Sequence, residues 1–78
     1  MLKDLKKYIL EGTFKVNIFE DKIDILNYLE IDHFDDTKII IRYEKGMLLV
    51  KGENLIITKL LDDELLINGK IKAIEFKW

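Results

Sequence analysis

The chain has 78 residues, enough for one small domain, and its 13 basic and 15 acidic side chains leave a formal net charge of −2. The absence of cysteine excludes disulfides, thiolate zinc sites and thiol nucleophiles, and the absence of a basic stripe argues against nucleic acid as a partner. Hydrophobic residues make up 49% of the sequence, but they occur in short runs, so we expect a globular domain without a membrane span.

The first twelve residues have the spacing of a short amphipathic helix. Leu2, Leu5 and Ile9 recur at helical intervals, and Gly12 lies where such a helix would end. We expect this helix to dock on the protein's own sheet. Because lysines flank the apolar stripe, a peripheral role at a membrane surface stays open as an alternative.

From residue 13 onwards the hydrophobic period changes from 3.6 to 2, which indicates β-structure. The predicted fold is mainly β: a single domain over residues 13–78, folded as an antiparallel meander of six to seven short strands. The inward-facing positions of these strands are Val16 and Ile18; Ile23 and Ile25; Ile39, Ile41 and Tyr43; Leu48 and Val50; Leu55 and Ile57; Leu65 and Ile67; and Ile71, Ile74 and Phe76.

Glycines mark three of the predicted turns. Lys45-Gly46 suits a three-residue hairpin loop with glycine in the left-handed position, and Gly52-Glu53 suits a tight turn. Asn68-Gly69 is the strongest hairpin signal in the chain, because both central residues of a type I′ turn need positive φ. The two Lys-Gly pairs do not fit a phosphate-binding loop, since the spacing and the following helix of that motif are missing.

Several predicted strands are apolar on both faces. If neighbouring strands pair in sequence, one row forms on the second face of the sheet, consisting of Ile40, Leu49, Ile56 and Leu66. A row of this kind needs a cover, so it is the candidate interface, and we expect self-association through sheet faces or edge strands. In the last strand, the step from Ile71 to Ile74 breaks the alternation and predicts a bulge near Lys72-Ala73.

Reactive groups are few. Asp32, His33, Asp35 and Asp36 are the one group that could be written as a metal site, yet their spacing matches no known loop, and a solvated acidic turn is the simpler interpretation. Serine and cysteine are absent, so nucleophilic catalysis is not expected. We therefore predict no enzymatic activity, no cofactor, no metal and no small-molecule substrate. A small ligand- or metal-binding domain using residues 32–36 is kept as an alternative.

Residues 46–76 resemble the YabP/YqfC family of sporulation proteins. The family pattern G-x-L-x-I-x-G-x-x-L-x-I, an acidic turn and E-L-x-I-x-G-x-I-x-x-I-x-Y/F is matched by Gly46, Leu48, Val50, Gly52, Leu55, Ile57, Glu64, Leu65, Ile67, Gly69, Ile71, Ile74 and Phe76. Upstream, residues 25–31 are similar to the family's I-E-N-H/Y-x-G-I, with departures at Leu26 and Glu30. The short chain is closer to the YqfC type.

The resemblance implies a small protein of the mother cell of an endospore-forming bacterium, cytoplasmic or membrane-associated. It implies a non-enzymatic assembly or adaptor module in spore-envelope morphogenesis. Its expected partners are further copies of itself and other sporulation proteins, some of them membrane-bound. The resemblance transfers no catalytic residues to this chain.

Overall fold

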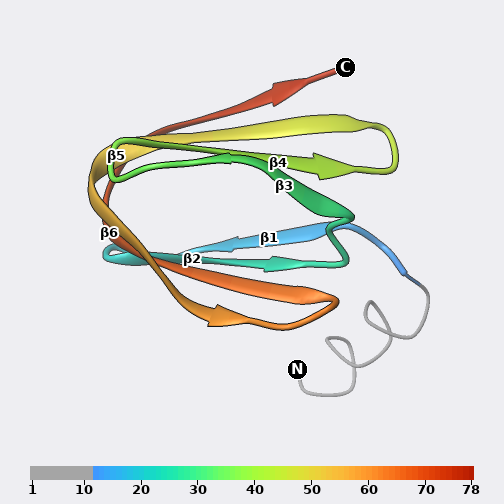
Figure 1. Ribbon diagram of the computed structural model, residues 1–78, viewed down its shortest axis with the longest axis horizontal. Coiled ribbons are helices and arrows are strands. Elements are labelled where there is room, and N and C mark those ends of the chain that lie inside the picture. The colour runs from blue at the N-terminus through green and yellow to red at the C-terminus, as the bar shows by residue number, and fades with distance from the viewer. Residues whose placement is uncertain (1–11) are drawn as a thin grey trace.

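The computed structural model describes residues 12–78, and the predicted N-terminal helix lies outside these described residues. The described part is a six-stranded antiparallel sheet (Figure 1). The strands are β1 (Lys15–Ile18), β2 (Lys22–Leu26), β3 (Glu30–Phe34), β4 (Lys38–Tyr43), β5 (Gly46–Leu60) and β6 (Glu64–Lys77). The mainly β prediction is confirmed for this part of the chain.

The order of the strands across the sheet is β1-β2-β6-β5-β4-β3. Consecutive strands pair as in a meander, except that β2 pairs with β6 and not with β3. The prediction of pairing entirely in sequence is therefore wrong at this point. The segment between β2 and β3 carries the chain from the second position of the order to its far end.

Two of the predicted turns are wrong, because β5 and β6 are single long strands. Gly52-Glu53 lies inside β5, and Asn68-Gly69 lies inside β6. Both pairs fall where the two strands bend together, with register shifts between Lys51 and Gly52 and beyond Glu53. The glycines therefore mark a bend in a continuous ladder. The same local chemistry that reverses a chain also permits such a bend.

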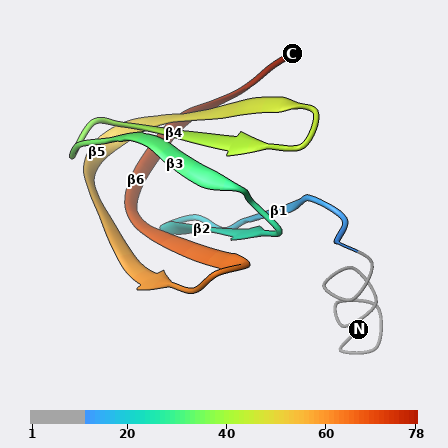
Figure 2. The ribbon, with the colours of Figure 1, turned by 45° about the vertical axis from the view of Figure 1, so that its right-hand side comes forward.

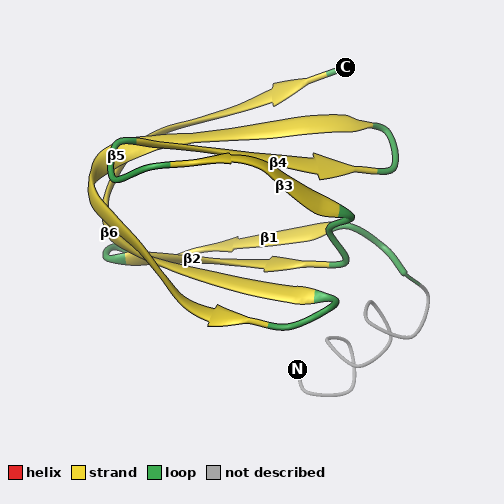
Figure 3. Ribbon diagram, viewed as in Figure 1, coloured by secondary structure: helices red, strands yellow, loops and turns green. Residues whose placement is uncertain are grey.

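The bend divides the sheet into two layers (Figures 1 and 2). One layer contains β3, β4, the beginning of β5 and the end of β6, and the other contains β1, β2, the beginning of β6 and the end of β5 (Figure 3). The β3–β4 turn is tied to the bend by two hydrogen bonds, from the Gly52 amide to the Thr37 carbonyl and from the Leu55 amide to the Asp36 carbonyl, both 2.9 Å. The layers therefore meet at a closed end.

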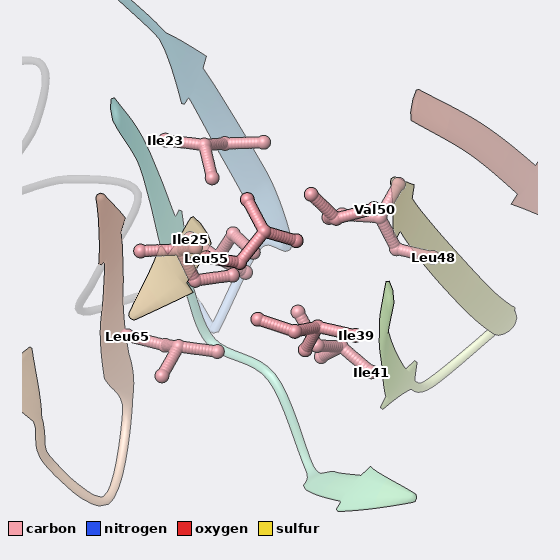
Figure 4. Packing of buried hydrophobic residues seen from close by; sticks show 9 residues of the cluster. Ile23, Ile25, Ile39, Ile41, Leu48, Val50, Leu55 and Leu65 are labelled. Carbon is pink, nitrogen blue, oxygen red and sulfur yellow. The ribbon is translucent and has the colours of Figure 1, made fainter. Parts of the chain in front are cut away.

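The core lies between these layers and is made by alternate residues of the strands (Figure 4). The side chains with no exposed surface are Ile23, Ile25, Ile39, Ile41, Leu48, Val50, Leu65 and Ile67. All of them were predicted to face inward from their period-2 spacing. Leu55 joins them from the part of β5 just beyond the bend, so that this single strand contributes to both sides of the core.

Glycine is required at the bend for two different reasons. A Cβ on Gly52 would lie 2.1 Å from the Lys70 carbonyl oxygen, so the two long strands approach too closely for any side chain. Gly69 has a φ of 137°, which other residues rarely adopt, and its amide donates to the Asp21 carbonyl at 3.0 Å. The sequence predicted positive φ at both Asn68 and Gly69; only Gly69 has it, and it serves a bend and not a hairpin.

The β4–β5 hairpin was predicted in the right place with the wrong geometry. Glu44 and Lys45 form a two-residue turn, and Gly46 already pairs with Tyr43 and does not have positive φ. Glycine is needed there because a Cβ would lie 2.1 Å from the Lys77 carbonyl oxygen. The predicted bulge in the last strand is confirmed: Lys51 pairs with Ala73 and Gly52 with Ile71, which leaves Lys72 without an opposite residue in β5.

Candidate functional site

The candidate interface does not form the single row that was predicted. Ile40 and Leu49 lie directly opposite each other on β4 and β5 and are half-buried. Ile56 lies beyond the bend, opposite Asn68, with 59% of its surface exposed. Leu66 is opposite Asp24 on one side and Lys59 on the other. The bend in β5 separates the first pair from the other two side chains, so the surface consists of separate apolar spots.

A cluster of aromatic side chains lies at the end of the sandwich opposite the bend. Phe14 stacks on Tyr43 with ring centroids 4.0 Å apart, and Phe76 meets both rings edge to face at 6.5 and 6.3 Å. Trp78 stacks on Phe76 at 6.0 Å and is 87% exposed. Tyr43 and Phe76 were predicted to face inward from their strands. The structure adds Phe14, which comes from the segment just before β1.

Two pockets of about 400 Å³ flank the β4–β5 turn at this same end. The first lies between the Phe14 segment and the turn and includes Asn27 and Leu29. The second is bounded by Leu29, Met47 and Trp78. Both are open grooves lined by apolar and charged side chains, and they surround the exposed apolar residues of this end with charged ones.

The acidic segment 32–36 does not bring its ligands together. Asp32 accepts a hydrogen bond from Arg42 Nη2 at 2.7 Å, whereas Asp35 lies 2.7 Å from His33 Nε2. Asp35 Oδ1 also accepts from the Thr37 amide at 2.8 Å and from the Lys38 amide at 2.7 Å. The hydrogen bonds from His33 and Thr37 hold the pKa of this carboxyl well below its usual range. Asp35 is thus the organiser of the β3–β4 turn.

Among residues 12–78, the structure brings together no group of three histidine or acidic side chains that could hold a metal ion. The segment is also not a simple loop, because Glu30–Phe34 is the strand β3, which was not predicted. Only Ile31 of this strand is a strong inward hydrophobic, so the period-2 signal is weak. Pairing with β4 makes the strand, with a register shift between Ile31 and His33.

The sequence did not predict a polar cluster on the outer face of the layer that contains β1 and β2. Asp24 lies at the centre of β2, and its Oδ1 atom is enclosed with no hydrogen-bond partner among the described residues. Burial, followed by a hydrogen bond with Glu64 and the negative charge of Glu64, raises the pKa of Asp24 to about 6. Lys59 Nζ lies 3.0 Å from Glu64 Oε1 and holds the pKa of Glu64 below its usual value. Below about pH 6, Glu64 therefore carries the charge and Asp24 carries the proton.

Comparison with known protein families decides the relationship of the chain. The model of the YabP family matches residues 19–78. The chain belongs to the YabP family. The match covers β2 to β6 in full, so the bent pair of long strands and the buried period-2 positions fall within the family's region. A search of curated proteins finds no match to this YabP-family chain.

Family membership confirms the resemblance drawn from residues 46–76 and connects the chain with sporulation. The structure explains the glycines of the family pattern: Gly46 and Gly52 face backbone carbonyls that leave no room for a side chain, and Gly69 has positive φ. Within residues 12–78, no helix of this YabP-family protein is long and apolar enough to cross a membrane.

Proposed function

We propose that this YabP-family protein is a non-enzymatic assembly or adaptor module in spore-envelope morphogenesis, acting in the mother cell through contacts with other proteins. The observation that carries the proposal is the set of large apolar side chains exposed outside a complete core. They include Leu29, Phe76 and Trp78 at the end of the sandwich opposite the bend, and Ile56 beyond the bend. Full burial of an exposed large apolar side chain contributes roughly 1.5–3 kcal/mol, and a partly exposed one contributes proportionally less, which favours a bound partner.

The chemistry of the described polar groups supports association more than turnover. Asp32 is engaged by Arg42 and Asp35 organises its own turn, so neither carboxylate is available in a pocket. Asp24 has a perturbed pKa, but it faces the outer side of a sheet beside Lys59 and Glu64, outside both pockets. These polar side chains interact with neighbours in the fold, whereas the exposed apolar side chains remain largely in contact with water.

A complementation experiment in cells that produce this protein tests the proposal. Deletion of the chain should lower the yield of heat-resistant spores, and the wild-type chain should restore it. The Leu29→Gln and Trp78→Gln variants should restore the yield poorly while folding normally. The matched variant Lys70→Gln, which replaces an exposed side chain of similar length, should restore it fully. Unchanged spore yield after deletion would refute the sporulation role.

A further inference from the structure

The two halves of β6 have different surroundings. Its first half, up to Asn68, pairs with β2 on one side and with β5 on the other. Its second half, from Lys70 to Lys77, pairs with β5 alone within the described part of the chain. A strand with one neighbour directs alternate amide and carbonyl groups to the open side, where another strand can add to the sheet.

The part of this edge nearest the bend is protected and the last part is not. Lys72 lies in the bulge and forms an ion pair with Glu53 at 2.5 Å, and both a bulge and a charged residue discourage strand addition. Ile74 to Lys77 pair with β5 without a register shift, and Trp78 follows directly after the strand. They carry Phe76, 44% exposed, and Trp78, 87% exposed, with Met47 beside them on β5. The open edge is thus regular only in residues 74–78, where the apolar side chains of Ile74, Phe76 and Trp78 alternate with the charged Glu75 and Lys77.

Charge decides what such an edge can pair with. When two copies of one strand pair as antiparallel neighbours, a two-fold axis perpendicular to the sheet relates them, and opposite residues must point to the same face. Residues on one face are an even number of positions apart, so one residue always lies opposite its own copy, and the axis passes between these two equivalent residues. An axis at Glu75 opposes two glutamates, and an axis at Lys77 opposes two lysines, both of which are unfavourable. An axis at Ile74 places Glu75 opposite Ala73, so this register adds no ion pair between the copies to those that Glu75 makes with Lys51 and Lys77 of its own chain.

The axis at Phe76 is the register that satisfies every side chain of the segment. Glu75 of each copy then lies opposite Lys77 of the other, which gives two ion pairs, and Ile74 lies opposite Trp78. The two Phe76 rings face each other at the centre. Opposite charges, aromatic pairs and aromatic–β-branched pairs are the cross-strand combinations that stabilise antiparallel sheets.

We propose that the protein forms a two-fold homodimer in which residues 74–78 of two copies pair as antiparallel strands centred on Phe76. This proposal rests on the proposed assembly function and names one partner for it, a second copy of the chain. The paired segment is short, so the dimer is weak, with a dissociation constant on the order of 10–100 µM.

Sedimentation equilibrium of the full chain between about 5 and 500 µM tests the dimer, and charge exchange tests its register. Glu75→Lys alone places lysine opposite lysine, and Lys77→Glu alone places glutamate opposite glutamate. Each should weaken the dimer at least about fivefold, because two symmetric pairs change from attraction to repulsion. The double variant restores opposite charges and should dimerise like the wild type. An equimolar mixture of the two single variants should form the heterodimer.

The matched control is Lys72→Glu, which disrupts an exposed ion pair on the same strand outside the paired segment and should leave dimerisation unchanged. Urea unfolding of each variant shows that the fold is intact. A wild type that is monomeric at 500 µM, a dimer indifferent to both single variants, or a double variant that stays monomeric would each overturn the edge dimer. None of these outcomes touches the sporulation role, which fails only if deletion leaves spore yield unchanged.

Discussion

Replacing Asp24 by asparagine should stabilise the protein at pH 8 and change little at pH 4. The pKa of Asp24 is about 6 in the folded chain and 3.8 in the unfolded chain. The folded state therefore holds the proton more tightly, and its stability falls as the pH rises from about 4 to about 6. Two pKa units correspond to about 3 kcal/mol. Because Asp24 is only partly buried, solvent screening reduces the expected gain of Asp24→Asn to about 1 kcal/mol.

Glu64 has the opposite effect on stability, so the contribution of Asp24 must be measured as the difference between Asp24→Asn and wild type at each pH. The lowered pKa of Glu64 contributes stability above its ordinary value of 4.5 that is lost as the pH falls. Urea unfolding at pH 4, 6 and 8 measures the difference between Asp24→Asn and wild type at each pH. The difference should grow from pH 4 to pH 6 and then level off. Asp21→Asn, at an exposed turn, is the matched control. A difference that is the same at all three pH values would show that the carboxyl is not protonated in the folded state.

Three further predictions concern the bend and the core, and equilibrium unfolding in urea measures all of them. Gly52→Ala should lower the free energy of unfolding by more than about 2 kcal/mol, because its Cβ would meet the Lys70 carbonyl at 2.1 Å and the backbone must move. A midpoint within error of wild type would contradict the close approach of β5 and β6. Gly69→Ala should cost about 1–3 kcal/mol, since alanine is strained at a φ of 137° and its Cβ would lie 2.7 Å from the Asn54 carbonyl oxygen. Gly12→Ala, at a φ of 71° with nothing within 4 Å, should cost less. Ile67→Ala should cost about 2–5 kcal/mol because the side chain has no exposed surface, whereas Ile56→Ala, 59% exposed, should cost under about 1 kcal/mol. Equal losses for these two variants would place the core on the wrong face of the sheet.

Hydrophobic alternation by itself determined which side chains form the core. Ile23, Ile39, Leu48 and Ile67 were assigned inward from a period of two, and all are fully enclosed. This assignment is local, because successive side chains of a strand point to opposite faces whatever the strand pairs with. The bulge at Lys72 and the positive φ of Gly69 were also predicted from the sequence. The family relationship rested on the same glycine and aliphatic spacing.

Only the tertiary structure decided where the chain turns and where it merely bends. Asn68-Gly69 has the chemistry of a hairpin, yet β6 bends there and continues as one strand, because β2 and β5 pair with it up to Asn68 and β5 pairs with it beyond. The same long-range pairing separated Leu49 from Ile56 and brought Asp24 beside Glu64 and Lys59. The free edge at residues 74–78 also follows from strand order. A period-2 pattern carries no information on which strand lies next to which, so strand order and open edges depend on contacts between residues far apart in the chain.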